Sequence, residues 1–232
     1  MLSYFFRGHI IQSPHTFAVR GSRAAKGWGW YKKYKEGGEE AFKKYQPPTP
    51  FDWEDESRSP VINKGIRSRP YFQLTIDGED VGEIQFELAD DILPETCSNF
   101  KALCTGESEQ GLSYCGSPIH HIVKGVGVIG GDVEKHDGTG NHSGLGKRYF
   151  EDEGFVIPHA EGGLLSMATS GVHTCASQFY LTLYPAPHMD GRCVAFGRII
   201  SGLDVLEAVY KQYSTRGKPA ASILISACGL RS

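Results

Sequence analysis

Two adjacent histidines, His120 and His121, lie in the middle of the chain and raise the question whether this protein is an enzyme. They lie in the apolar, glycine-rich stretch GSPIHHIVKGVGVIGGD, residues 116 to 132. An imidazole can exchange a proton near neutral pH and can ligate a metal. Either role requires partner groups, so we next consider the titratable residues elsewhere in the chain.

A second group of titratable residues, His136, Asp137 and His142, follows within a short distance. Imidazole and carboxylate groups are both metal ligands, but neither a helical spacing nor a CxxC pair organises these three. The overlapping stretch GTGNHSGLG departs from the phosphate-loop pattern, and we interpret its glycines as turn residues. We therefore expect no metal and no cofactor.

The cysteines do not form a recognisable site either. They lack a CxxC pair and any regular spacing, so we expect reduced thiols rather than a zinc site or a disulfide scaffold. No Ser-His-Asp set or Cys-His pair can be identified from the sequence. The six residues concerned are Cys97, Cys104, Cys115, Cys175, Cys193 and Cys228.

Charge divides the chain into two parts. Residues 1–69 carry 13 basic and 7 acidic side chains, whereas residues 70–232 carry 11 basic and 20 acidic ones. Different surroundings are expected for the two parts. No apolar run approaches the roughly 20 residues that a membrane-spanning helix needs, so we expect a soluble protein or one that associates peripherally with a membrane complex.

Residues 1–35 are basic, with seven Lys or Arg and no Asp or Glu. An acid-poor, basic and partly amphipathic segment is typical of mitochondrial targeting. The alternative is a basic arm that contacts an acidic partner. Mitochondrial localisation is therefore the first hypothesis, and a nuclear, cytoplasmic or ciliary location is the alternative.

Residues 36–69 continue as a charged segment with no periodicity that would close a core, apart from a short helix expected near residues 39–45. Together with the end of the basic segment they are rich in aromatic residues, which predicts an arm that orders against a protein partner. Nucleic acid is a weaker candidate because seven acidic residues follow Lys35. The predicted partner-binding anchors are Trp28, Trp30, Tyr31, Tyr34, Phe42, Tyr45, Phe51 and Trp53.

From residue 70 to residue 232 the sequence consists of short alternating runs. The runs on both sides of Asp77 and Gly78 predict a β-hairpin. Pro94 is expected to begin a helix that packs on a sheet, and a second helix is expected over residues 202–212. Further strand-like runs predict an antiparallel barrel capped by helices.

Over residues 70–230 the sequence resembles the cyclophilin family of peptidyl-prolyl isomerases. The resemblance is carried, in family order, by FELADDILPETCSNFKALCTGE, GGDVEKHDGTGNHSGLGKRYFEDEGFVIPH, GGLLSMATSG, ASQFYLTL and MDGRCVAFGRIISGLDVLEAV. It implies a mainly β fold, a closed eight-stranded antiparallel barrel with two helices. Residues before Pro70 lie outside the family domain and form an extended N-terminal arm.

The resemblance also implies where the active site should be, and the chain departs from the family there. His121 occupies the position of the catalytic Arg, which donates to the proline nitrogen. A neutral imidazole offers one donor where Arg offers five, and losing a directed donor costs on the order of 10² to 10³ in rate. No catalytic residue is therefore expected.

The walls of the implied proline pocket also differ. Val126 and Gly127 stand where the family has Phe and Met, and Cys193 stands at the pocket His. Of the groups that would touch a peptide, Ala168 and Gln178 remain usable, and Tyr180 and Met189 are further candidates. The residues expected to form the degenerate peptide groove are Ile119, His121, Val126, Gly127, Ile129, Ala168, Thr169, Gln178, Tyr180, His188, Met189 and Cys193.

These features predict a non-catalytic cyclophilin-like subunit of a large protein complex, contacted mainly through residues 1–69. The favoured host is a mitochondrial respiratory-chain assembly. One alternative is a divergent isomerase or proline-peptide binder with weak activity. Another is a scaffold in a spliceosomal or ciliary assembly.

Overall fold

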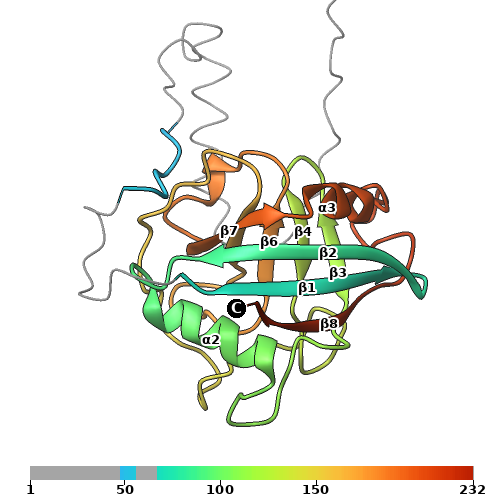
Figure 1. The fold of residues 1–232 in the computed structure, drawn as a ribbon, viewed down its shortest axis with the longest axis horizontal. Helices are drawn as coiled ribbons and strands as arrows, with labels where there is room; N and C mark the ends of the chain where they lie inside the picture. The colour runs from blue at the N-terminus through green and yellow to red at the C-terminus, as the bar shows by residue number, and fades with distance from the viewer. Residues whose placement is uncertain (1–47, 56–66, 232) are drawn as a thin grey trace, which may run out of the picture. The chain divides into compact units, whose positions relative to one another are not determined.

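The computed structural model of the protein describes residues 48–55 and 67–231, which form one strongly curled antiparallel sheet with two helices (Figure 1). The strand order is β3-β4-β6-β5-β7-β2-β1-β8. The strands are β1 (Arg69–Ile76), β2 (Glu79–Leu88), β3 (Ile119–Val123), β4 (Gly127–Gly130), β5 (Leu164–Met167), β6 (Phe179–Thr182), β7 (Ala195–Ser201) and β8 (Ile223–Arg231). The helices are α2 (Pro94–Thr105), α3 (Leu203–Tyr210) and the short 3-10 helix η2 (Pro187–Met189). The expected mainly β fold with eight strands and two helices is confirmed.

The first hairpin forms where the sequence predicted it. Asp77 and Gly78 join β1 to β2 with φ values of 49° and 87°. Two consecutive residues with positive φ are what a tight hairpin turn requires, and Asp-Gly tolerates them. The paired strands then alternate, so that Phe72 of β1 and Ile84 and Phe86 of β2 are buried.

Helix α2 lies on one side of the β1–β2 pair and α3 lies on the other in Figure 1. Pro94 is at the start of α2 as expected, and the helix buries Phe100 and Leu103. The residue before the helix supplies no side-chain cap. Instead the Glu153 carboxylate accepts hydrogen bonds from the backbone N–H groups of Glu95 and Thr96, at 2.9 and 2.8 Å.

The two edge strands of the curled sheet meet through a short contact beside β3. Pro118 and Leu224 form an isolated antiparallel bridge. Next to it, Gly116 N–H donates to the Ile225 carbonyl at 2.7 Å, and Ile225 N–H donates to the Ser117 carbonyl at 3.0 Å. This contact places β3 beside the segment that precedes β8.

Two of the aromatic residues expected to anchor a partner are instead buried against the chain's own sheet. Phe51 and Trp53 are 5% and 6% exposed, belong to the main hydrophobic core and pack edge to face at 5.3 Å. The guanidinium carbons of Arg67 and Arg198 lie over the Trp53 ring, at 5.4 and 5.0 Å from its centroid. For these two residues the partner is the protein itself, because the sheet offers apolar area and cations that match an indole.

Polar contacts hold the same segment in place. Arg67 Nη1 donates to the Trp53 carbonyl at 2.6 Å, and Arg198 pairs with Glu54 at 3.1 Å. Glu87 of β2 in turn pairs with Arg198 at 2.7 Å. Residues 48–55 are therefore part of the folded domain, which extends beyond the expected boundary at residue 70.

The other expectations about the N-terminal part lie outside the described residues. These are the basic segment over residues 1–35, the helix near residues 39–45 and the remaining six aromatic anchors. Within residues 48–55 and 67–231, no helix combines the length and apolar character needed to cross a bilayer.

We expect the Trp53→Ala substitution to lower the free energy of unfolding by about 3 kcal/mol, because truncating a buried aromatic side chain typically costs this much. Urea unfolding of the full chain measures the change. Val172, which is 78% exposed, provides the control, and Val172→Ala should shift the value by less than about 0.5 kcal/mol. A cost below about 1 kcal/mol for Trp53→Ala would contradict the packing described for this segment.

Candidate functional site

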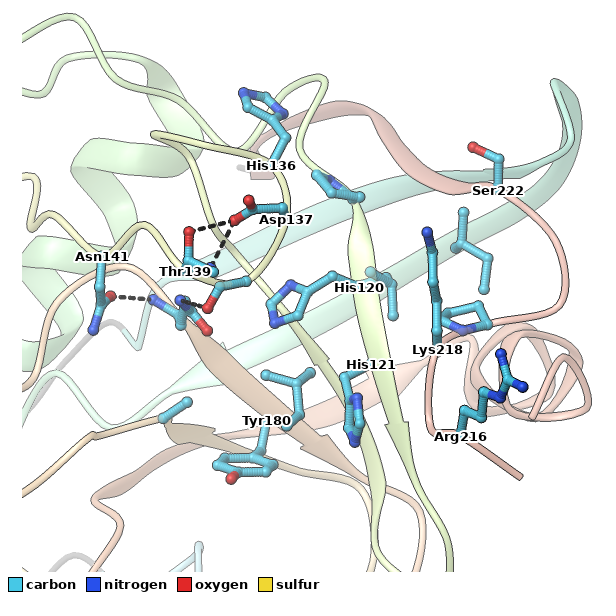
Figure 2. A pocket seen from close by; sticks show the side chains of 18 of the residues that line it. His120, His121, His136, Asp137, Thr139, Asn141, Tyr180, Arg216, Lys218 and Ser222 are labelled. Atoms are coloured by element: carbon cyan, nitrogen blue, oxygen red, sulfur yellow. Dashed lines mark hydrogen bonds between the residues drawn. The ribbon is translucent and has the colours of Figure 1, made fainter. Parts of the chain in front are cut away.

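A groove with a volume of about 960 Å³ runs along β3 and gathers residues from distant parts of the chain (Figure 2). One wall comes from β3, β4 and β6, and a second comes from the loop that precedes β8. A third comes from the loop that follows β4. The named side chains that line it include His120, His121, His136, Asp137, Thr139, Tyr180, Arg216 and Lys218.

The structure brings seven of the twelve expected groove residues to this cavity. They are Ile119, His121, Ile129, Ala168, Thr169, Gln178 and Tyr180. The other five do not line it, and they are Val126, Gly127, His188, Met189 and Cys193. Three of these five, Val126, Gly127 and Cys193, stand where the resemblance placed the proline pocket.

Residues of the apolar part of the expected site pack against one another. Val126 and Met189 are 6% and 5% exposed and form a small hydrophobic cluster with Ala186. Tyr180 and Cys193 pack against this cluster. Burial raises the pKa of the Cys193 thiol to about 11, so this group stays protonated at neutral pH. These side chains are small or already packed, and none of Val126, Met189 and Cys193 lines the groove.

Gly127 could not carry the larger side chain that the resemblance implies at its position. A Cβ atom added to Gly127 would overlap the carbonyl oxygen of Leu181, which belongs to the neighbouring strand β6. The obstacle is backbone, which cannot move aside as a flexible side chain can. The close spacing of β4 and β6 therefore excludes a pocket-wall side chain at this position.

His121 is held against the loop that precedes β8. A Cβ atom at Gly217 would overlap the His121 ring, so the imidazole packs directly on the Gly217 backbone. Gly217 has a φ of 81°, and its carbonyl accepts a hydrogen bond from Ile122 N–H at 2.7 Å. The glycine is required here both for its left-handed conformation and for the space it leaves.

His120 is a groove residue that the sequence reasoning did not single out as one. Its ring packs on Gly138, and its Nδ1 atom is buried without a hydrogen-bond partner among the described residues. Burial lowers the pKa of His120, and the nearby Asp132 carboxylate opposes the shift without reversing it. At neutral pH this ring is therefore uncharged, which is the state that burial favours.

The Asp132 carboxylate organises the loop that follows β4. Asp132 is fully buried and accepts hydrogen bonds from five backbone N–H groups at 2.8 to 3.1 Å. Burial alone would raise its pKa, but hydrogen bonds from the N–H groups of Lys135, Gly140, Gly138 and Glu134 outweigh burial and lower the pKa to about 2. The loop that carries His136, Asp137 and Thr139 is thereby fixed.

Gln178 is retained from the family pattern, but its donors are engaged. Its Nε2 atom donates to the carbonyl oxygens of Gly138 and Gly140, at 3.1 and 2.5 Å. Asn141 accepts from the backbone N–H of Gln178 at 3.2 Å. Both N–H groups of the side-chain amide thus hold the loop, so that Gln178 shapes the groove rather than offering a free donor to a ligand.

A second arrangement, away from the groove, resembles a hydrolytic triad in its distances. His159 Nε2 lies 3.0 Å from Ser166 Oγ, and His159 Nδ1 lies 2.8 Å from Asp190 Oδ1. Both His159 and Ser166 are fully buried. A nucleophile that no substrate can reach does not react, so these contacts serve to hold Asp190 at the end of η2.

The described residues contain no cluster of three or more His, Cys, Asp or Glu side chains suited to a metal. His136 and Asp137 line the groove, whereas the His142 Nδ1 atom lies 3.0 Å from the Ser143 carbonyl oxygen. The three residues considered as metal ligands from their closeness in sequence therefore do not share one site.

Several groove residues could not be recognised from the sequence. Arg216 and Lys218 are more than 90 residues from His121, and they follow α3 in a stretch without a catalytic motif. A basic residue in a polar loop is ordinarily a solvated surface group. The contact of that loop with β3 is what places these cations at the groove.

Comparisons with known proteins agree with this architecture. The family model described as "Cyclophilin type peptidyl-prolyl cis-trans isomerase/CLD" matches residues 71–230. The NK-tumor recognition proteins of Mus musculus and Homo sapiens are each 42% identical to the chain over 175 residues, which is 72% of this chain. The matched part is 12% of the length of either relative.

We expect the Asp132→Asn substitution to lower the free energy of unfolding at pH 7 by about 2 kcal/mol, which follows from a pKa of about 2 in the fold against 3.8 for an unperturbed Asp. Because the folded-state pKa is lowered, the stabilisation is fully present above about pH 4 and is lost as the pH falls toward 2. Urea unfolding from pH 7 to pH 2 measures both effects.

The difference between the wild type and Asp132→Asn should therefore shrink toward pH 2. Glu151 is exposed, so Glu151→Gln provides a matched amide control and should leave the curve close to that of the wild type. A difference that stays constant over the whole pH range would show that the carboxylate charge is not what stabilises the loop.

Proposed function

Because this chain belongs to the cyclophilin-type peptidyl-prolyl cis-trans isomerase family, we propose that its domain is a binding and scaffold module with little or no isomerase activity. The observation that carries the proposal is the small, buried apolar cluster of Val126, Ala186 and Met189, in which Val126 stands where the resemblance implies a large wall of the proline pocket. The groove beside it remains open.

Rotation about an X-Pro bond must overcome a barrier of roughly 18 to 20 kcal/mol. The family resemblance implies that an enclosing pocket and a donor aimed at the proline nitrogen lower this barrier. An aromatic wall buries about 150 to 250 Å², which at about 25 cal/mol per Å² amounts to several kcal/mol of ring binding. Val126 is small and buried, and Gly127 has no side chain. Most of this free energy of ring binding is therefore lost.

The donor is weakened independently of the pocket. His121 stands at the position of the catalytic Arg and offers one imidazole N–H, where a guanidinium offers five N–H groups. Its ring is held on Gly217. A missing directed donor costs on the order of 10² to 10³ in rate, and this loss multiplies the loss of ring binding.

The domain keeps its hydrophobic core although the residues of the expected active site differ. This favours a structural role over a general loss of function. We propose that the chain is an accessory subunit of a large complex, with a mitochondrial respiratory-chain assembly as the favoured host. The basic composition of residues 1–35 supports mitochondrial targeting. A spliceosomal or ciliary assembly is the alternative host, with a nuclear or cytoplasmic location.

The proposed partner contacts lie mainly in the N-terminal part of the chain. The six aromatic residues from Trp28 to Tyr45 remain the proposed anchors, whereas Phe51 and Trp53 are buried in the chain's own core. The partners would be protein subunits rather than nucleic acid, since acidic residues are interspersed after Lys35. Peripheral association with a membrane complex is compatible with this composition.

A divergent isomerase with weak activity is the second candidate. Ala168, Gln178 and Tyr180 still line the groove, so a peptide has a surface on which to lie. This candidate requires His121 to act as the donor and the proline ring to bind without large walls at Val126 and Gly127.

Purification of the chain through a C-terminal tag, with each fraction assayed on an X-Pro peptide, separates the two candidates. We expect recovery in a large complex and turnover at the level of the buffer blank, because both the ring pocket and the donor are missing. An intact cyclophilin assayed in parallel is the positive control. A free monomer with turnover well above the blank, lost in His121→Ala, would support the isomerase instead.

Restoring the donor alone should not restore catalysis. We expect His121→Arg to leave kcat/KM at the blank level, since Val126 and Gly127 still lack the large apolar walls of the proline pocket. Gln110, which is exposed and outside the groove, supplies the control Gln110→Arg, and thermal unfolding checks that both variants fold. A rise above about tenfold in His121→Arg alone would show that the ring pocket is functional and that a single residue blocks catalysis.

A further inference from the structure

The groove is a locally basic region in an acidic domain. Residues 70–232 carry 20 acidic and 11 basic side chains, yet the groove is lined by Arg216 and Lys218 against one carboxylate, Asp137. Three of its other lining residues are histidines. A cleft whose charge opposes that of the surrounding domain attracts ligands of the domain's own sign.

The one carboxylate in the groove is engaged within its own loop. Asp137 accepts hydrogen bonds from the backbone N–H and the hydroxyl of Thr139, at 2.8 and 2.6 Å. These hydrogen bonds lower the pKa of Asp137, so it stays ionised and keeps its local donors. Figure 2 shows Asp137 and Thr139 on the opposite side of β3 from Lys218 and Arg216.

The two cations, in contrast, have no ion-pair partner in the part of the chain that the structure describes. Both Arg216 and Lys218 are exposed. By comparison, Arg67, Arg198 and Arg231 each pair with a carboxylate of the domain. Unpaired cations at the mouth of a cavity can contact the charge of a ligand without first giving up an internal ion pair.

The loop that presents these cations is fixed in place before any ligand binds. Gly217 N–H donates to the Ser214 carbonyl at 2.9 Å, and Ser214 Oγ donates to the Lys218 carbonyl at 2.5 Å. The Gly217 carbonyl accepts from β3, and the His121 ring packs on its backbone. A preorganised loop reduces the entropy lost on binding.

The ligand class follows from what the groove offers and what it lacks. The apolar residues Val126, Met189 and Cys193 do not line the groove, whereas Arg216 and Lys218 do, so the groove selects by charge rather than by an apolar ring. We propose that the groove binds an acidic peptide segment of a partner protein, with Lys218 and Arg216 contacting its Asp or Glu carboxylates. This inference rests on the proposed binding role and deepens it by naming the ligand.

Fluorescence anisotropy of the full chain with labelled peptides tests the inference. The probe is a peptide of alternating Glu and Ala, its counterpart with Gln in place of Glu has the same length, and a neutral X-Pro peptide is the third ligand. We expect the Glu peptide to bind at least about tenfold more tightly than the Gln peptide, and its affinity to fall as salt is raised.

A pair of double variants with equal net charge locates the site. Lys218→Gln with Arg216→Gln should weaken binding of the Glu peptide by about tenfold or more. Lys124→Gln with Lys211→Gln removes two exposed cations outside the groove and should stay within about twofold of the wild type. Equal weakening of both double variants would overturn the proposal, because only net charge would then matter.

The remaining outcomes separate this inference from the proposed function. If no peptide binds and the X-Pro peptide is not turned over, the acidic-ligand inference fails while the loss of catalysis stands. If the X-Pro peptide binds best and is turned over, the proposed function fails as well. An RNA oligonucleotide that binds more tightly than the Glu peptide would also overturn the inference in favour of a nucleic-acid ligand.

Discussion

The aromatic cluster inside the curled sheet is the contact on which the rest of the domain depends. Phe100 of α2 packs against Phe72 of β1 at 5.5 Å, against Tyr114 at 5.0 Å and against Phe196 of β7 at 5.3 Å. Phe179 of β6 completes the cluster at 5.4 Å from Phe72. Rings at these separations contribute more than their buried area alone, and they join a helix to strands from both halves of the sheet. Because this core is intact, the surface above it can change without loss of the fold.

The groove illustrates that freedom and its limit. Its backbone frame comes from β3, β4 and β6, whose pairing is set by the core, while its chemistry comes from side chains and loops that the core does not constrain. Gly127 is an instructive case, because the backbone of the neighbouring strand occupies the space that a side chain would need. The altered site thus combines changed side chains with a backbone spacing adapted to them. A fold of this kind does not by itself imply the chemistry associated with it.

The elements of the fold and the residues of the groove differ in how far the sequence predicts them. The Asp77-Gly78 turn, the start of α2 at Pro94 and the alternation of β1 and β2 are local patterns, and the sequence predicted them. The family resemblance implied the eight-stranded sheet, which the structure shows as strongly curled, and the position of β3 at the groove. Phe51 and Trp53 were interpreted as anchors for another protein, since aromatic residues in a charged stretch look alike whether their partner is another chain or the same one. Lys218 reaches the groove through a contact between loops and strands distant in sequence, which no local pattern encodes.

The capping of α2 has a consequence for how the chain acquires its structure. The helix begins at Pro94 with no cap of its own, and Glu153, 57 residues beyond Thr96, fulfils that role. During synthesis the segment of α2 therefore emerges well before the carboxylate that satisfies its first N–H groups. Short helices without caps are marginal in water, so α2 gains its full stability only after the chain has been made past residue 153. The helix that places Phe100 in the core thus depends on Glu153, which is synthesised well after the helix itself.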